Sequence, residues 1–387
     1  MNKKILLKTR FSGVSLHSLY KTILENPPEG FNIEYVRNNF NTIVYSIDNK
    51  SVNPFIRQII YNLKPIPYIL SQKYQKNNLN YDLIYASQHV LFNYEKPWIT
   101  DCEFVNAFAA FGKFSIVKNS IRKRFESNSC KFILPWSNWA QKTILKSMDC
   151  EKFKDKIKVL RYTVEPKKFI KTKHDGINFL FVGSTNPMNY RNIQFKNLRE
   201  TIIAFNNISK KYDNISLTIR SFVPNELKEI CKKNSNIRII EKFLEEQELF
   251  ELYSDSDIFV LPSHETSGIS LLDAMSFEIP VIAMNIYDIP EIINHLKNGI
   301  LLTPPTKMKY YTSTFTPNDH AFEFLTGISR CSEEIIDQLE ENFILLIENE
   351  KLRRILGSEA RKTVEYGEFS VNYQKKKLLS IYEEATK

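Results

Sequence analysis

The chain alternates short apolar runs with longer stretches in which apolar residues recur at helical spacing, and it does so twice. The first series has apolar runs at residues 5–7, 43–45, 83–85, 98–100 and 131–134. The second series has runs at residues 179–182, 216–219, 237–240, 258–261, 281–283 and 299–302. Such alternation is typical of β-α-β units, whose strands pair side by side in a parallel sheet. The pattern therefore predicts an α/β chain with two doubly wound parallel sheets.

A stretch dense in lysine and proline, residues 165–176, separates the two series and is the best candidate for a linker. It predicts a first Rossmann-like domain over residues 1–168 and a second over residues 169–387. The region from residue 333 to the end is expected to be helical, with the last helix as a candidate to pack back on the first domain. Folds of this kind bind ligands at the carboxyl ends of their strands. Two such domains facing each other predict an active-site cleft.

The composition excludes several classes of protein. Of the 387 residues 43% are hydrophobic and 25% charged, which is ordinary for a globular chain and excludes wholesale disorder, collagen and coiled coil. The net charge of +9 favours anionic partners such as nucleotide phosphates or acidic lipid. The 5 cysteines form no C-x-x-C pair, so we expect reduced thiols and no zinc site. No apolar stretch reaches the length of a membrane span, and we expect a soluble, cytoplasmic protein.

The segment from Pro262 to Met275 carries the most chemistry. Its strand ends in a short loop with Glu265 and Gly268, after which a helix begins. Free N–H groups and the dipole at a helix start attract anions, and glycine allows a ligand close to the backbone. Glu265 and Asp273 are eight residues apart, which places one carboxylate at the loop mouth and the other two turns into the helix. Two acceptors separated in this way suit two groups of hydroxyls, such as those of a sugar and a ribose.

This segment resembles the Glu-x7-Glu signature of glycosyltransferase family 4, of the glycosyl transferases group 1, with Asp273 in place of the second Glu. The flanking residues 252–263 and 279–299 resemble the family too, as does the closing region 352–370. The resemblance covers the second half of the chain well and the first half weakly. It implies the GT-B fold and a retaining, hexosyltransferase-like enzyme. Such an enzyme moves a sugar from a nucleoside diphosphate sugar to a glycan, a lipid-linked acceptor or a small molecule.

The resemblance also implies roles for individual residues. Glu265 would bind the hydroxyls of the donor sugar and Asp273 the ribose, while Gly268, Ile269 and Ser270 would offer backbone N–H groups to the donor. These are the family's donor-binding positions carried over to this sequence. They place the donor against the second domain.

A second matching block begins at Gly183 and continues to Lys196, where the family has cations for the donor diphosphate. Lys196 fits the family's lysine, and an ammonium at a helix start is suited to a phosphate. The family's arginine is replaced by Ser184, and Arg191 and Arg220 are two alternative sources of that charge. Because protein cations would stabilise the leaving diphosphate, the resemblance implies a reaction without a metal or another cofactor.

In the first half, Gly13 resembles a glycine of the family loop that approaches the diphosphate and the acceptor. The histidine that family members often carry near the donor sugar has no counterpart in the loop of residues 97–104. Asp101 and Glu103 are candidates to face the cleft in its place, and His89 ends the preceding strand-loop unit. The missing histidine and Ser184 support an alternative function, that of a catalytically impaired relative serving as a binding or scaffold subunit. A nucleic-acid partner is not expected, since no recognition motif is present.

The segment of residues 113–125 interleaves cations with apolar residues. Its apolar members at helical spacing are Phe114, Val117, Ile121 and Phe125, and its cations include Lys118, Arg122, Lys123 and Arg124. Such a helix suits either an ordinary core face, which is favoured, or a membrane surface. Membrane contact would make the protein peripheral at the cytoplasmic membrane face and would suit a lipid-linked acceptor. The donor base and sugar, the acceptor and the oligomeric state stay open at this level.

Overall fold

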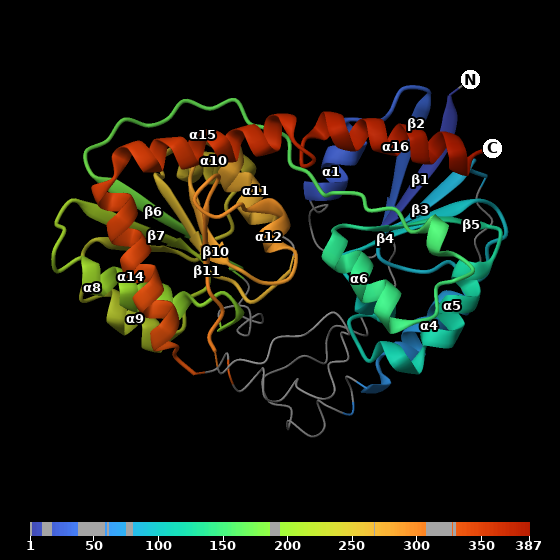
Figure 1. Cartoon of the computed structure of the whole chain (residues 1–387), viewed down its shortest axis with the longest axis horizontal. Coiled ribbons are helices and arrows are strands. Elements are labelled where there is room, and N and C mark those ends of the chain that lie inside the picture. Colours follow the sequence, from blue (N-terminus) through green and yellow to red (C-terminus); the bar gives the residue numbers. More distant parts are fainter. Residues whose placement is uncertain are drawn as a thin grey trace. The chain divides into compact units, whose positions relative to one another are not determined.

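The computed structural model describes residues 2–9, 18–37, 59, 62–74, 80–185, 194–266, 268–306, 327 and 330–387. They form two compact units (Figure 1). The first unit contains the described residues of Met1–Thr163 together with Val371–Lys387. The second contains those of Val164–Lys309 and Phe322–Ser370. The last helix therefore belongs to the first unit, although it follows the second unit in the chain.

The first unit is built on a five-stranded sheet with the strand order β2-β1-β3-β4-β5. Its strands are β1 (Lys3–Thr9), β2 (Phe31–Arg37), β3 (Leu83–Ala86), β4 (Trp98–Cys102) and β5 (Cys130–Pro135). Every pairing in it is parallel, with Ile5 of β1 level with Ile33 of β2 and Leu83 of β3. Strand β1, its neighbour β3 and strand β4 are almost wholly buried, which explains their continuous apolar runs.

One strand differs from the expectation. The sequence pattern predicts the second strand at residues 43–45, which lie outside the described residues, whereas β2 occupies residues 31–37. β2 is the edge strand of its sheet. Asn32 and Glu34 are exposed while Phe31 is buried, so β2 has no continuous apolar run by which it could be recognised.

Helices and short 3₁₀ turns cover the first sheet. They are α1 (Ser18–Glu25), α4 (Pro65–Tyr74), η2 (Val105–Ala109), η3 (Phe114–Ile116), α5 (Lys118–Glu126), α6 (Asn138–Ser147), η4 (Lys154–Lys156) and α16 (Val371–Ala385). α16 is held by Gln374, whose Nε2 donates to the carbonyl of Arg161 at 2.8 Å, and by Tyr382, whose ring meets Phe31 edge-on at 5.4 Å. These contacts account for its place in the first unit.

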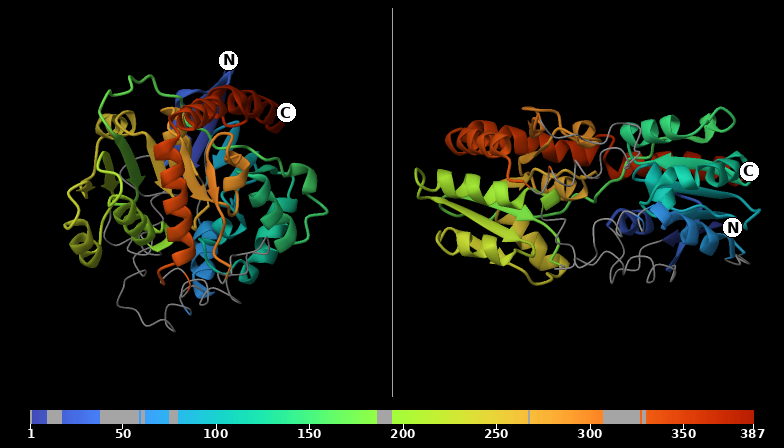
Figure 2. Two further views of the ribbon diagram at one scale, coloured as in Figure 1. Left: turned by 60° about the vertical axis from the view of Figure 1, so that its left-hand side comes forward. Right: turned by 90° about the horizontal axis from the view of Figure 1, so that it is seen from below.

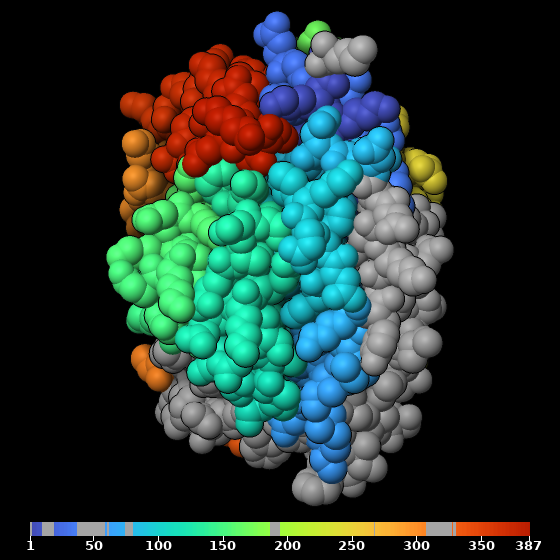
Figure 3. Space-filling view, turned by 90° about the vertical axis from the view of Figure 1, so that its right-hand side faces the viewer, coloured from blue at the N-terminus to red at the C-terminus, as the bar shows by residue number. Residues whose placement is uncertain are grey.

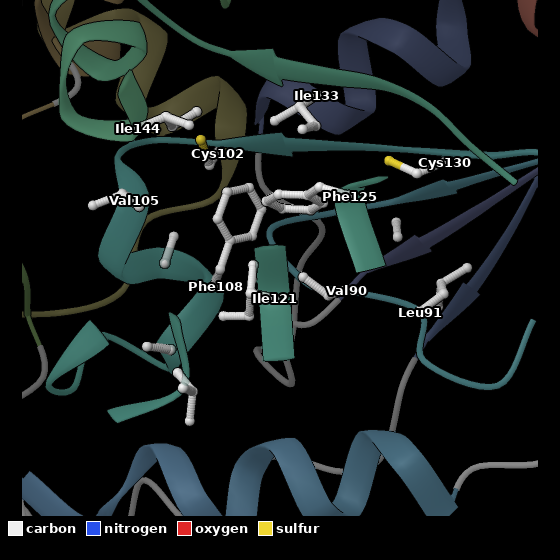
Figure 4. Packing of buried hydrophobic residues seen from close by; sticks show 14 of the residues in the cluster. Val90, Leu91, Cys102, Val105, Phe108, Ile121, Phe125, Cys130, Ile133 and Ile144 are labelled. Carbon is white, nitrogen blue, oxygen red and sulfur yellow. The ribbon is translucent and has the colours of Figure 1, made fainter. Parts of the chain in front are cut away.

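The helix α5 presents its apolar face to the core of the first unit. Ile121 and Phe125 are fully buried, and Phe125 packs edge-to-face on Phe108 at 5.1 Å between ring centroids (Figure 4). Arg124 is also buried, donating to the carbonyls of Leu91 and Tyr94. The favoured expectation of a core face is thus confirmed. Arg124 does not lie on an exposed basic face with the other cations of residues 113–125, because its guanidinium donates to two backbone carbonyls inside the unit.

The second unit is built on a six-stranded sheet with the order β11-β10-β9-β6-β7-β8. Its strands are β6 (Ile177–Val182), β7 (Ile215–Arg220), β8 (Ile237–Ile240), β9 (Ile258–Leu261), β10 (Val281–Met284) and β11 (Ile300–Leu302). All pairs are parallel. The chain runs outward from β6 to β8 and then returns to β9 on the other side of β6. The strand order therefore reverses between β6 and β9, and this is the switch point at which such sheets bind ligands.

Helices flank the second sheet on both sides (Figure 2). They are α8 (Leu198–Ile208), α9 (Asn225–Cys231), α10 (Glu246–Ser254), α11 (Ile269–Ser276), α12 (Ile289–Ile292), α14 (Glu333–Glu348) and α15 (Glu350–Tyr366). Phe179 of β6 packs against Phe205 of α8 and Phe343 of α14, with ring centroids 5.7 and 4.9 Å away. Both units thus confirm the expected α/β class with doubly wound parallel sheets. Among the described helices, none is long and apolar enough to cross a bilayer.

Candidate functional site

A small pocket opens beyond the carboxyl end of β9, beside the switch point of the second sheet. Its lining includes four residues that the sequence singles out, and these are Lys196, Glu265, Gly268 and Ser270. Leu261, Ala283 and Met284, from the ends of β9 and β10, form its apolar side. The fold thus brings together residues that are far apart in the sequence, at the place where a doubly wound sheet binds its ligands.

Lys196 and Glu265 form an ion pair in this pocket. The Nζ atom of Lys196 lies 2.8 Å from Oε2 of Glu265, and the two side chains are 17% and 32% exposed. The hydroxyl of Ser263 lies 3.2 Å from the same carboxylate oxygen. Partial burial strengthens the attraction relative to a pair in water. The pocket therefore offers, side by side, a cation suited to phosphate and a carboxylate suited to hydroxyls.

A second pair of residues joins the two loops that carry this ion pair. The Nδ2 atom of Asn197 donates to the carbonyl of Pro262 at 2.6 Å and lies 2.9 Å from Nε2 of His264. The backbone N–H of His264 donates to the carbonyl of Phe195 at 2.6 Å. His264 is almost fully buried, and this burial lowers its pKa to about 3, so its ring is neutral. With Nε2 as an acceptor, both amide hydrogens of Asn197 are used.

These joining residues were not among the site residues predicted from the sequence. Their only sequence signal is adjacency, because Asn197 follows Lys196 and His264 precedes Glu265. Asn197 has a φ of 51°, and asparagine is among the few residues that enter this left-handed region readily. The conformation that lets α8 begin at Leu198 thus also directs an amide toward the other loop.

The start of α11 borders the pocket. Gly268 precedes the helix, and a Cβ atom there would lie 2.7 Å from Cδ1 of Ile292, so a larger residue would crowd α12. Ser270 lines the pocket, whereas Ile269 is buried and is not part of the lining. Gly268 thus lets the start of α11 pack closely against the side chains of α12.

Asp273 lies further along α11 and is not among the pocket residues. Its charged neighbours are Lys167 and Glu246, and Tyr253 also lies near it. Loss of solvation raises the pKa of its carboxyl group to about 7, and Lys167 opposes that shift. The structure therefore does not bring Asp273 together with Glu265 and Lys196. Its role toward a ribose stays a prediction.

Gly183 directly follows β6, on the other side of the switch point. A Cβ atom there would lie 2.5 Å from Oγ of Ser221, which leaves no room for a side chain. Arg220 ends the neighbouring strand and donates through Nη1 to the carbonyl of Gly183 at 3.1 Å. Of the two alternative sources of the charge missing at Ser184, Arg220 thus lies beside the Gly183 loop, and Arg191 lies outside the described residues.

Among the candidates from the first half of the chain, Asp101 is the one whose surroundings the structure describes most fully. Asp101 is fully buried and accepts from the hydroxyls of Tyr20 and Tyr85 at 3.0 Å and from the N–H of Gln88 at 2.8 Å. This placement makes Asp101 an internal carboxylate of the first unit, because three donors of that unit use its lone pairs.

The remaining candidates of that half have varied placements. His89 is buried, with Nδ1 2.9 Å from the carbonyl of Ser87. Glu103 is partly exposed after β4, and Gly13 lies outside the described residues. Among the residues that the structure describes, no group of three or more His, Cys, Asp and Glu side chains is placed to hold a metal ion.

Comparison with known proteins agrees with this geometry. Residues 158–313 match the family model described as glycosyl transferases group 1. This span contains the ion pair, Gly183 and the whole of α11. No curated protein sequence matches the chain.

Solved structures resemble the chain in fold. A glycosyltransferase from Rickettsia africae is 18% identical with a TM-score of 0.59, covering 100% of both chains. HepE from Anabaena, in complex with UDP and glucose, is 12% identical with a TM-score of 0.60, covering 99% of this chain and 100% of its own. TarM of S. aureus is 18% identical with a TM-score of 0.54, and the match covers 78% of this chain but 54% of TarM. The two sheets give the chain the GT-B fold of these structures, and residues 158–313 match the family model of the glycosyl transferases group 1.

Proposed function

We propose that this protein is a retaining glycosyltransferase that moves a sugar from a nucleoside diphosphate sugar to an acceptor. The observation that carries the proposal is the ion pair of Lys196 and Glu265 in a pocket at the switch point of the second sheet. The group 1 match over residues 158–313 supports it. Among the structural relatives, HepE is described with UDP and glucose and TarM with UDP, which favours the same class of donor here.

In this proposal the pocket holds the two halves of the donor. Lys196 contacts the diphosphate, and the start of α11 at Gly268 directs N–H groups to it. Glu265 accepts hydrogen bonds from the sugar hydroxyls. Because Asn197 and His264 fix both loops before the donor arrives, little reorganisation is needed on binding.

The transfer step itself needs no protein nucleophile in this proposal. The bond between the anomeric carbon and the diphosphate oxygen breaks, and the acceptor oxygen bonds to that carbon on the same face. The acceptor proton passes to the leaving diphosphate. Lys196 and the start of α11 stabilise the charge that develops there, which is work that a metal ion does in other enzymes. The proposal therefore includes no metal cofactor.

The alternative function, a binding or scaffold subunit, follows from Ser184 at the position of the family's arginine. Arg220 beside Gly183 favours the enzyme over this alternative, because it supplies a cation next to the loop in which the arginine is lacking. Loss of a charge-assisted contact costs about 1.5–3 kcal/mol. That loss would weaken donor binding without abolishing it.

The test begins with thermal unfolding of the purified protein in the presence of nucleoside diphosphates and nucleotide sugars. A bound donor raises the unfolding temperature by mass action. Release of the nucleoside diphosphate in the presence of candidate acceptors then measures transfer. Glu265→Gln should keep the thermal shift and lose transfer, because an amide cannot accept hydrogen bonds at both positions.

The matched control is Glu229→Gln, which removes a carboxylate from an exposed ion pair with Lys232 in the same unit. It should behave like the parent. Binding of a nucleotide sugar without turnover would favour the scaffold alternative. Absence of any nucleotide-dependent shift would overturn the proposed function.

A further inference from the structure

Two segments of the first unit contain cations but no acidic residue. Residues 59–81 and residues 104–125 lack both Asp and Glu, although 25% of the whole chain is charged. The first segment contains α4, and the second contains η2, η3 and most of α5. The cations of these segments therefore have no acidic neighbour within their own segment, and any carboxylate that pairs with them comes from elsewhere in the chain.

The two segments pack against each other. Helix α4 contacts both η2 and η3, and α5 continues from η3. The space-filling view shows the blue residues around α4 beside the turquoise residues that come next in sequence (Figure 3). Helix α4 and the 3₁₀ turn η3 thus lie next to each other in the first unit.

This part of the first unit also carries apolar side chains that the core does not use. Helix α4 buries Tyr68 and Ile69 in the core, while Ile66 and Leu70 on its other side are 41% and 45% exposed. Leu63 and Ile59, which precede α4 in the chain, are 51% and 41% exposed. Ile116 at the end of η3 is 42% exposed as well. Single exposed apolar residues are ordinary, whereas a row of them marks an interaction surface.

Lysines surround the apolar row. Lys73 lies in the last turn of α4, and Lys113 and Lys118 flank η3 on either side of Ile116. Among the described residues, no carboxylate forms an ion pair with any of these three. By contrast, Arg122 on α5 pairs with Glu126 and Asp149. These three lysines are therefore the cations of this surface that we assign to an external anion.

We propose that this α4 surface, made of the apolar row Ile59, Leu63, Ile66, Leu70 and Ile116 with the lysines Lys73, Lys113 and Lys118, docks on an anionic lipid bilayer. The apolar side chains enter the boundary between headgroups and acyl chains, and the lysines contact lipid phosphates. The lysines favour an anionic surface. The aliphatic side chains favour lipid over nucleic acid, which would be contacted by polar and aromatic groups. The proposal does not rest on the proposed function.

The test is cosedimentation of the full chain with vesicles of phosphatidylglycerol and phosphatidylcholine, compared with phosphatidylcholine alone. The parent should bind the anionic vesicles more tightly and lose affinity as salt rises. Lys113→Gln with Lys118→Gln should weaken binding roughly 25-fold, at about five-fold for each basic residue. Ile66→Gln with Leu70→Gln should weaken binding to anionic vesicles by roughly tenfold or more, because two buried aliphatic side chains are lost. All four positions are at the surface, so the unfolding temperature should not change.

Matched controls come from the second unit. Leu345→Gln with Ile355→Gln replaces two other exposed apolar residues, and Lys211→Gln with Lys233→Gln replaces two other exposed lysines. These should sediment like the parent. Equal binding to both kinds of vesicle, no binding to either, or α4-surface variants that bind like the parent would overturn the proposal. A parent dimer that Ile66→Gln with Leu70→Gln converts to a monomer would also overturn it, since the surface would then pair with a second copy.

Discussion

The side-chain amide of Asn197 lies 2.9 Å from Nε2 of His264, and each of the two residues is the chain neighbour of one member of the Lys196–Glu265 ion pair. The contact joins the segment that precedes α8 to the loop that follows β9. It places the ammonium and the carboxylate by fixing the backbone beside each of them. Asn197 and His264 are therefore positioning residues, which contact each other and not the pocket.

Asn197→Gly and His264→Ala test this coupling. Glycine keeps the left-handed backbone of residue 197 and removes only the amide. Each change should destabilise the second unit by about 1–3 kcal/mol, because a buried polar partner is left unsatisfied. The double variant should lose less than the sum of the two. Urea unfolding of the four proteins measures the coupling, and additive losses would show that the two residues act independently.

Lys196→Ala should weaken binding of a nucleoside diphosphate more than binding of the matching nucleoside. The reason is that only the diphosphate has the charge that the ammonium meets, a contact of about 1.5–3 kcal/mol. Calorimetry with both ligands measures the difference. Lys228→Ala, which breaks a partly buried ion pair with Glu241 elsewhere in the unit, is the control and should affect neither ligand. Equal losses for both ligands with Lys196→Ala would show that the lysine acts through structure alone.

Asp101 should make the stability of the first unit depend on pH. Loss of solvation raises its pKa from 3.8 to about 6. Between these values the folded state binds a proton that the unfolded state has released, so the free energy of unfolding falls as pH rises from about 4 to 6. This decrease in the free energy of unfolding is absent below pH 4 and complete above pH 6, and it amounts to about 3 kcal/mol at most.

The measurement for Asp101 is urea unfolding at several pH values for the parent and for Asp101→Asn. The variant cannot ionise, so the difference between the two proteins should change across this window and be constant above it. The variant also lacks an acceptor oxygen for the hydroxyls of Tyr20 and Tyr85, and this loss changes its free energy of unfolding by an amount that does not depend on pH. A difference that is the same at pH 4 and pH 7 would contradict the raised pKa of Asp101.

Gly357 should tolerate no larger residue. It lies in α15 where that helix packs on α11, and an added Cβ atom would be 2.2 Å from the backbone oxygen of Glu278. A backbone atom cannot move aside as a side chain can, so Gly357→Ala should cost about 1–3 kcal/mol of stability despite the better helix propensity of alanine. Ser358→Ala in the same helix is the control. Thermal unfolding compares the two, and a Gly357→Ala protein as stable as the parent would contradict the close packing.

The sequence predicted most strands well because a strand buried on both faces needs a continuous apolar run. The run at residues 258–261 coincides with β9, and the run at residues 83–85 lies within β3. This criterion missed β2, because an edge strand needs only its inner face to be apolar and so has no continuous apolar run. The segment around Glu265 was recognised for a similar reason, since its strand, glycine and helix start follow one another in the chain.

Only the tertiary structure determined which residues from distant segments of the chain contact one another. Glu265 was predicted from its own surroundings and Lys196 from the family resemblance, but only the folded second unit shows them 2.8 Å apart and shows Asp273 outside the pocket that both of them line. Asp101 was predicted to lie at a strand end. Only the packing of the first unit shows that its carboxylate accepts hydrogen bonds from Tyr20, Tyr85 and Gln88. Local sequence determines which residues form strands, helices and caps, because those choices depend on neighbours along the chain. The contacts between side chains depend on how the faces of these elements pack against one another. This packing is determined by residues that are far apart in the sequence.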